Sequence, residues 1–523
     1  MKRKLTEEEY KIIIERACKE VIENLDTEED KEDYKTIMEE ITEKLLETMD
    51  WDPKDVINYV VKDYIEQITA IAKLSPGLET GLIDTKYGIT FNTIIGKTSD
   101  IENAEDISED TVFDVSSMTK FFTSVLLLKE AEEGKIDLNK KFSEYSKVLE
   151  KMDESIIKAL KFGTTVRTDE LVAKDGLSKE ERLKALLSAH TLPGKAFEYN
   201  DIQYMLVPFL FSDDAEEATE IYLKKFYSLY KGIGLSQTGY STINMSGGNV
   251  TVKYDENGNE KHLGLEIFDP KAHKVETEIG LVPTHAGVTS SIIDLEKLFI
   301  EIENGLLNEE SIKSLITTIT NNNIYLLDEN NEALLNSKGE KIKVNHAMGV
   351  FPHVGDVRIC DIADGPSKDA FVIAGSTGSW FTFDKSNGLA YGYLPNIRSG
   401  LYPREIDVDY PYGTEGDEIP FGKNIVHLGS AAYNKGSMED GKLERGEGKP
   451  NMPFTTETNH FKRQQFEIII KLRIAKLSEI VKAHIENDDK EYEKICEIIE
   501  KAFNNKKYQK IDKKEKNKSF IKI

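Results

Sequence analysis

Residues 113–138 read FDVSSMTKFFTSVLLLKEAEEGKIDL, and this stretch decides the fold. Its middle is almost entirely apolar, and Gly134 follows at the point where a glycine commonly ends a helix. A helix that is apolar on every side lies inside a domain rather than on its surface. The pattern therefore predicts a central, buried helix from Ser117 to Glu133.

Ser117 and Lys120 stand three residues apart at the start of this helix. Residues at that spacing lie on one helical face, so the lysine amine can reach the serine hydroxyl. The first turn also offers backbone N–H groups and the positive end of the helix dipole, which stabilise developing negative charge. Burial would let the lysine lose its proton more easily. We predict Ser117 as nucleophile and Lys120 as its base; Ser116 is the alternative nucleophile, disfavoured by its place at or before the helix start.

The same stretch resembles the nucleophile segment of the superfamily of class C β-lactamases, D-alanyl-D-alanine carboxypeptidases and β-lactamase-like esterases. Residues 192–206, LPGKAFEYNDIQYML, are similar to the second motif of that superfamily, usually Tyr-x-Asn. Tyr199 takes the place of the tyrosine, and the resemblance implies that its phenol works with Lys120 in proton transfer. Asp201 stands in the asparagine place, a departure that argues more against a β-lactamase than against a hydrolase in general.

Residues 371–384, FVIAGSTGSWFTFD, resemble the strand of the family that carries Lys-Thr-Gly or His-Thr-Gly. Here the triplet is Ser-Thr-Gly, so Ser376 replaces a cation that normally helps to bind a substrate carboxylate. This change predicts that penicillins and D-Ala-D-Ala peptides are poor substrates. By resemblance, the Ser379 N–H joins the Ser117 N–H in the oxyanion hole, with Ser376 and Gly378 beside the substrate.

Two glycines and a histidine in these segments each have a functional and a structural interpretation. Gly375 and Gly378 would let the strand backbone approach a ligand closely, or they mark a bulge. Residues 269–299 resemble the stretch before a later helix of the family and add no reactive group. Within that stretch, His285 is more often a structural residue than a base.

The order of the three motifs implies the fold of that superfamily over residues 53–400 plus the C-terminal helix. We predict an α/β (α+β) fold, in which an antiparallel sheet is flanked by helices and joined to a mainly helical subdomain, as in β-lactamases and transpeptidases. Apolar runs and turn residues place the strands at 78–96 (two strands), 346–351, 357–362, 370–374, 379–383 and 389–394.

The same patterns divide the chain into four parts. We expect a helical N-terminal extension at 1–50, a hydrolase core at 51–139 and 286–505 with an insertion at 399–460, a mainly helical subdomain at 140–285, and a basic tail at 506–523. An Asn257-Gly258 turn predicts a hairpin in or beside the helical subdomain.

Composition narrows the classes of partner and cofactor. The formal charge of −26 argues against nucleic acid as a partner, although eight lysines between 506 and 522 could touch an anionic surface or stay solvated. Three scattered cysteines, no apolar run long enough for a membrane span and no signal-peptide pattern favour a cytoplasmic protein. No metal, nucleotide or other cofactor motif is present.

The sequence favours a serine hydrolase that acts on a small-molecule ester or amide through an acyl-enzyme on Ser117. An esterase-like activity is favoured over a β-lactamase or peptidase. The alternative is a catalytically inactive member that binds or scaffolds, which Asp201 and Ser376 motivate. Residues 1–50 would then serve a protein partner or self-association.

Overall fold

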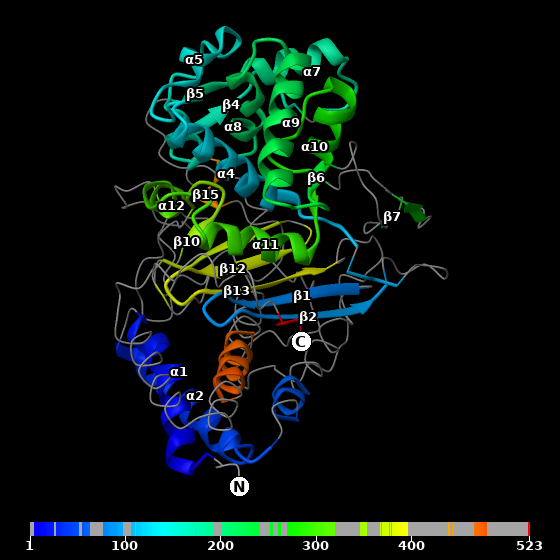
Figure 1. Cartoon of the computed structure of the whole chain (residues 1–523). Helices are drawn as coiled ribbons and strands as arrows, with labels where there is room; N and C mark the ends of the chain where they lie inside the picture. The colour runs from blue at the N-terminus through cyan, green and yellow to red at the C-terminus, as the bar shows by residue number, and fades with distance from the viewer. Residues whose placement is uncertain are drawn as a thin grey trace.

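The computed structural model describes residues 5–25, 28–51, 55–62, 77–97, 106–109, 111–172, 174–192, 200–240, 252–254, 260–262, 269–318, 346–352, 367, 369–375, 377, 379–395, 438–439, 442–443, 465–478 and 521–522. A sheet crosses the middle of the molecule between a helical part and a group of terminal helices (Figure 1). The predicted architecture of an antiparallel sheet flanked by helices, with a mainly helical part beside it, is confirmed.

In the part of the chain that the structure describes, the sheet has seven strands. All neighbours are antiparallel except the last pair, in which residues near the C-terminus run parallel to β2. The end of the basic tail is thus held on the sheet edge. The order is β10 (Phe351–Pro352), β11 (Phe371–Ala374), β12 (Trp380–Asp384), β13 (Leu389–Pro395), β1 (Gly77–Asp84), β2 (Ile89–Gly96) and β16 (Ile521–Lys522).

Five of the predicted strands are confirmed: the pair at 78–96 and those at 370–374, 379–383 and 389–394. The strand expected at 346–351 is wrong except at its end, because 346–347 have no regular secondary structure and 348–350 form a bend before β10. The run at 357–362 lies outside the described residues. The two strands of the predicted hairpin are present as the antiparallel pair β7 (Val252–Tyr254) and β8 (Glu260–His262), and the Asn257-Gly258 turn lies outside the described residues.

One face of the sheet packs against the predicted central helix and the helix α11 (Ile292–Glu303). The central helix is a short 3₁₀ turn, η1 (Ser116–Met118), followed by α4 (Thr119–Glu132). Phe121 on α4 and Phe381 on β12 both approach Phe299 of α11, with ring centroids 5.9 Å and 5.2 Å away. These aromatic contacts fix the nucleophile helix relative to the sheet.

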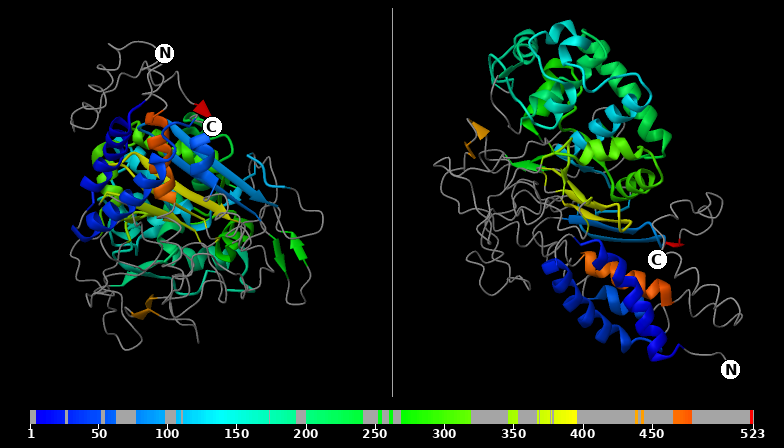
Figure 2. Two further views of the ribbon diagram at one scale, coloured as in Figure 1. Left: turned by 90° about the horizontal axis from the view of Figure 1, so that it is seen from below. Right: turned by 90° about the vertical axis from the view of Figure 1, so that its left-hand side faces the viewer.

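The opposite face of the sheet packs against helices from both ends of the chain. These are α1 (Glu7–Glu23), α2 (Glu28–Leu46) and a C-terminal helix over 465–478, and Figure 2 shows them together on that side. Tyr10, Ile14 and Ile41 of the N-terminal pair are buried in one core with Trp380 and Tyr391 of the sheet. The apolar faces of these helices are therefore covered within the chain, and a role of residues 1–50 in binding a protein partner or in self-association stays a prediction.

Residues 140–285 supply most of the helical part. Its longest helix, α9 (Ala215–Gly232), packs on α4 through a buried group of aromatic rings. The other elements are α5 (Phe142–Tyr145), η2 (Lys147–Leu149), α6 (Ile156–Leu160), β4 (Thr165–Arg167), α7 (Lys179–Leu187), β5 (His190–Leu192), α8 (Ile202–Met205), η3 (Val207–Leu210), β6 (Gly239–Tyr240), α10 (Pro270–Lys274) and η4 (Val275–Ile279). The helix α12 (Glu309–Ile316) follows α11, and β14 (Met438–Glu439) pairs with β15 (Lys442–Leu443) within the excursion 399–460.

A buried carboxyl group on β1 makes the stability of the fold depend on pH. Glu79 is 1% exposed, and its Oε2 accepts the N–H of Ile292 at the start of α11. Burial raises the pKa of Glu79 to about 8, so the folded chain keeps a proton that the unfolded chain loses near pH 4.5. The stabilising contribution is therefore complete below about pH 4.5 and is lost as the pH rises to about 8.

We expect Glu79→Gln to remove this dependence, because the amide stays neutral and can still accept the Ile292 N–H. Between pH 6 and pH 9, the free energy of unfolding of the native chain should fall by about 3 kcal/mol more than that of the variant. Urea unfolding at both pH values measures the difference. Parallel curves for the two proteins would contradict the assignment.

Candidate active site

The nucleophile turn begins where a short strand ends. β3 (Phe113–Asp114) pairs with β9 (Val288–Ser290), and the carboxylate of Asp114 then accepts the N–H of Ser116 at 2.7 Å. Ser116 has a φ of 46° and is fully buried, whereas Ser117 is partly exposed. A non-glycine residue in the left-handed region is held by its surroundings at a cost, and such strain gathers at functional turns. The turn thus hides Ser116, the alternative nucleophile, and presents Ser117.

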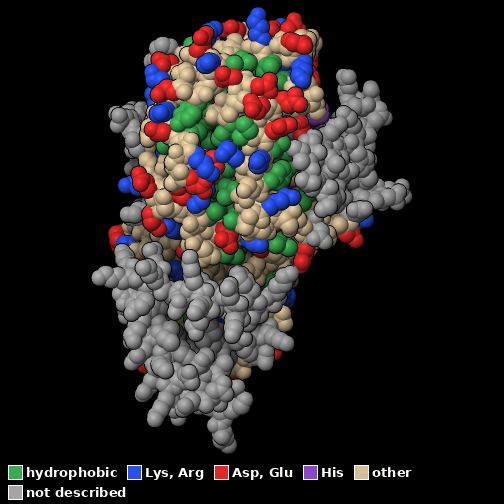
Figure 3. Space-filling view, turned by 45° about the horizontal axis from the view of Figure 1, so that its top comes forward, with side chains coloured by type: hydrophobic (Ala, Val, Ile, Leu, Met, Phe, Trp, Pro, Cys, Tyr) green, Lys and Arg blue, Asp and Glu red, His purple; other side chains and the backbone are tan. Residues whose placement is uncertain are grey.

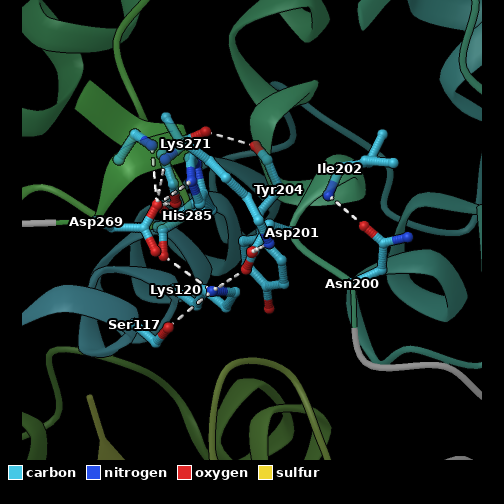
Figure 4. Close-up of polar contacts among 12 residues, drawn as sticks. Ser117, Lys120, Asn200, Asp201, Ile202, Tyr204, Asp269, Lys271 and His285 are labelled. Atoms are coloured by element: carbon cyan, nitrogen blue, oxygen red, sulfur yellow. Dashed lines mark hydrogen bonds and ion pairs between the residues drawn. The ribbon is translucent and has the colours of Figure 1, made fainter. Parts of the chain in front are cut away.

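Lys120 reaches Ser117 as the three-residue spacing predicts. Its Nζ donates to Ser117 Oγ at 3.2 Å and to the carbonyl oxygen of His285 at 2.9 Å (Figure 4). The lysine side chain is 2% exposed, so the amine points into the protein and not into solvent. Hydroxyl and amine are therefore within proton-transfer distance in a largely dry environment.

Asp201 is the carboxylate partner of Lys120. Its Oδ1 lies 2.9 Å from Lys120 Nζ and its Oδ2 lies 2.7 Å from Lys271 Nζ. Burial would raise the pKa of Asp201, but the charges of Lys120 and Lys271 outweigh burial and hold that pKa well below its usual range. An ionised carboxylate this close stabilises the ammonium form of Lys120, which opposes the easy deprotonation expected from burial alone.

The neighbouring Asn200 is turned away from this group. Its amide oxygen accepts the N–H of Ile202, and its amide nitrogen donates to the carbonyl of Val166. Position 201, the place matched to the asparagine of the family, is thus the one that faces Lys120.

The strand β11 lies against the nucleophile turn through glycine. A Cβ at Gly375 would lie 2.2 Å from the carbonyl oxygen of Val115, so no larger residue fits there without a shift of the backbone. The Gly375 N–H donates to the carbonyl of Ser379 at 2.8 Å, and Ser379 is fully buried. At Gly375, the close approach that we expected toward a ligand is therefore an approach to the nucleophile turn itself.

The family of the chain follows from a comparison of its sequence with a family model that spans the site. The family model described as Beta-lactamase matches residues 83–409, which contain every element of the site above. The chain belongs to the beta-lactamase family. The superfamily expected from the three motifs is thus confirmed.

Individual relatives of this beta-lactamase family member are distant. Protein flp from Staphylococcus aureus (strain NCTC 8325 / PS 47) is 25% identical over 182 residues, which are 32% of this chain and 36% of that protein. The match therefore spans about a third of the relative. Among solved structures, the D-alanine carboxypeptidase AmpC from Burkholderia cenocepacia has 14% identity and a TM-score of 0.43, covering 67% of this chain and 95% of that one. A penicillin-binding protein from Bacillus halodurans has 15% identity and a TM-score of 0.44, with coverages of 65% and 94%.

The structure brings part of the predicted site of this family member together. Ser117, Lys120 and Asp201 form one connected group, whereas Tyr199, Ser376 and Gly378 lie outside the described residues, so their roles and that of Ser379 stay predictions. Sequence reasoning missed Lys271, the second partner of Asp201. The Asp269-Pro270 pair, which begins α10 with a side-chain cap, was the signal that marks this helix.

The surface, the helices and the polar side chains bear on what the chain could bind. On the face drawn in Figure 3, acidic, basic and apolar side chains are intermixed over the helical part. Among the described residues, no helix has the length and apolar character needed to cross a bilayer, and no group of three or more His, Cys, Asp or Glu side chains could hold a metal ion.

Proposed function

We propose that this chain is a serine hydrolase that forms an acyl-enzyme on Ser117. The observation that carries the proposal is the 3.2 Å contact between Lys120 Nζ and a partly exposed Ser117 Oγ, made inside an otherwise buried helix start. A nucleophile within hydrogen-bond reach of a base that is itself held by a third group is the arrangement that acyl transfer needs. Here the third group is Asp201.

The reaction has two halves. Ser117 Oγ bonds to the acyl carbon while its proton passes to the neutral amine of Lys120. The bond between the acyl carbon and the leaving group then breaks, and the leaving oxygen or nitrogen takes that proton. Water releases the acyl group by the reverse route, and the Ser117 hydroxyl is restored. By resemblance, Tyr199 would share the proton transfer, and the N–H groups of Ser117 and Ser379 would bind the oxyanion.

The substrate class that fits best is an ester rather than a β-lactam. Ser376 replaces the lysine or histidine whose charge would hold the carboxylate of a penicillin, and a serine hydroxyl offers one neutral hydrogen bond in its place. A neutral hydrogen bond is weaker than one to a charged group, so affinity for carboxylate-bearing substrates should fall. We therefore propose small acyl esters as substrates, ahead of β-lactams or D-Ala-D-Ala peptides.

The second candidate function is a member that binds a ligand or partner without turnover. It is favoured by the Asp201 ion pair, because a lysine that remains an ammonium ion cannot accept the proton of Ser117.

Covalent labelling separates the two candidates. We expect a fluorophosphonate to add once to the full chain, with the adduct mapped to Ser117, because the probe needs only a competent nucleophile and no knowledge of the substrate. Intact-mass spectrometry before and after incubation measures the stoichiometry, and heat-unfolded protein is the control. Complete absence of an adduct would sink the hydrolase proposal and favour the binding role; rapid turnover of nitrocefin would overturn the preference for esters.

A further inference from the structure

The carboxylate of Asp201 is shared between two ammonium groups that differ in exposure. Lys120 Nζ contacts Oδ1 at 2.9 Å and Lys271 Nζ contacts Oδ2 at 2.7 Å. The side chain of Lys120 is 2% exposed, that of Asp201 is 12% exposed and that of Lys271 is 51% exposed. The three residues therefore form a charged row beside the nucleophile (Figure 4), and the rising exposed fractions show that its outer end reaches solvent.

This charged row affects the protonation state of Lys120, on which the proposed mechanism depends. Lys120 must be neutral to accept the proton of Ser117, yet a carboxylate at hydrogen-bond distance stabilises its charged form. A second cation on the same carboxylate acts in the opposite direction, because it offsets the negative charge and repels the ammonium of Lys120. Lys271 is suited to this role, since Asp201 above all raises its pKa and keeps it charged.

The cap of the helix that carries Lys271 lies near a residue that binds Lys120. Asp269 caps α10, and its Oδ1 accepts the N–H groups of Lys271 and Ala272 at 2.9 Å each. The same oxygen lies 3.7 Å from His285 Nε2, and the carbonyl of His285 accepts a hydrogen bond from Lys120. Asp269 thus caps the helix that carries the outer cation and lies beside the residue whose carbonyl accepts from the inner amine.

Further titratable residues near Lys120 are Tyr204, whose ring centroid lies 5.9 Å from Lys120 Nζ, and His346. His346 is buried between the rings of Phe162 and Phe351, with centroids 5.5 Å and 4.7 Å away. Burial, and then the charge of Lys120, lower the pKa of His346 to about 3, so its ring is neutral at ordinary pH. Asp201 and Lys271 are therefore the charged groups that bear most directly on Lys120, and the carboxylate of Asp269 acts on Lys271 in turn.

We propose that Lys271 is a positioning residue of the active site: it holds the outer oxygen of Asp201 and offsets the charge of this carboxylate, so that Lys120 can take the proton of Ser117. The inference rests on the proposed hydrolase function and deepens it. It also gives a physical reason why an aspartate can stand where the family has asparagine without disabling the lysine.

The test follows the rate of Ser117 acylation by a fluorophosphonate between pH 5 and 10, which reports the nucleophile and its base without a natural substrate. Without the second cation Lys120 should hold its proton to higher pH. Lys271→Met should therefore move the acidic limb of the rate profile about one pH unit higher and slow acylation near neutral pH about tenfold. Lys271→Arg should stay near the native profile, since it keeps the charge. Asp201→Asn should move the limb lower, and adding Lys271→Met to Asp201→Asn should cost much less than Lys271→Met costs alone.

Lys274→Met is the matched control, because Lys274 lies on the same helix and pairs with Asp175 away from the site. It should leave the pH profile unchanged, and thermal unfolding checks that every variant is folded. An unshifted limb in folded Lys271→Met, or an equal loss with and without Asp201→Asn, would overturn this inference while leaving the hydrolase proposal intact. A native chain that is not acylated at any pH would overturn both.

Discussion

Replacing Ser117 by alanine is expected to abolish the fluorophosphonate adduct and to reduce ester turnover by about ten-thousandfold or more. Removal of a catalytic serine has an effect of this order, because no remaining group can form the acyl-enzyme and only binding and oxyanion contacts survive. The neighbouring Lys120 would lose the hydroxyl that lies 3.2 Å from its Nζ but would keep Asp201 and the His285 carbonyl. The fold should therefore stay intact. Turnover of a p-nitrophenyl ester and intact-mass labelling measure the two effects.

Ser116→Ala is the matched control for this prediction. Ser116 is adjacent in sequence and also a serine, but it is fully buried and its backbone is tied to Asp114. We expect this variant to keep the adduct on Ser117 and to turn over substrate within about threefold of the native rate. The substitution leaves the Ser117 hydroxyl and its contact with Lys120 in place. An adduct on Ser116, or labelling that persists in Ser117→Ala, would mean that Ser116 is the nucleophile in place of Ser117.

The contact between Ser117 and Lys120 could be predicted from sequence because it is local. Helical geometry fixes which side chains meet three residues apart, and the apolar residues after Lys120 indicate that the amine is buried. The Asp201 contact needed the second motif, because position 201 is brought to Lys120 only by tertiary structure. The contact between Lys271 and Asp201 had no such guide, because 70 residues separate the two and no local pattern joins them.

The N-terminal helices show a different limit of sequence reasoning. The apolar spacing in 1–50 correctly indicated two helices that each bury one face. A stripe of this kind shows that a face is covered but does not identify what covers it. The structure supplies the answer: β1 and β13 are buried along their whole length, which requires cover on both faces of the sheet.

The second large effect is expected at Arg473, which ties the C-terminal helix to the sheet. Arg473→Met should lower the free energy of unfolding by about 3–5 kcal/mol. Arg473, on the C-terminal helix 465–478, donates from Nε to Asp84 Oδ2 at 2.6 Å and from Nη2 to the carbonyl of Asn387 at 2.9 Å. Both charged side chains are fully buried. Removing Arg473 leaves the buried charge of Asp84 without this ionic partner, although the N–H groups of Lys86 and Tyr87 still bind its Oδ1, and such a loss costs far more than the pair contributes.

Three measurements of urea unfolding distinguish this mechanism from a simple loss of packing. The double variant Asp84→Asn with Arg473→Met should recover a large part of the loss, since no uncompensated charge remains buried. Lys385→Met, which breaks the pair with the exposed Glu309 on the same chain, should cost less than about 1 kcal/mol. If Arg473→Met cost no more than Lys385→Met, the C-terminal helix would be held by its apolar contacts alone. If the double variant were as unstable as Arg473→Met, the loss would come from the missing side-chain volume and the Asn387 contact, because charge burial would then make no difference.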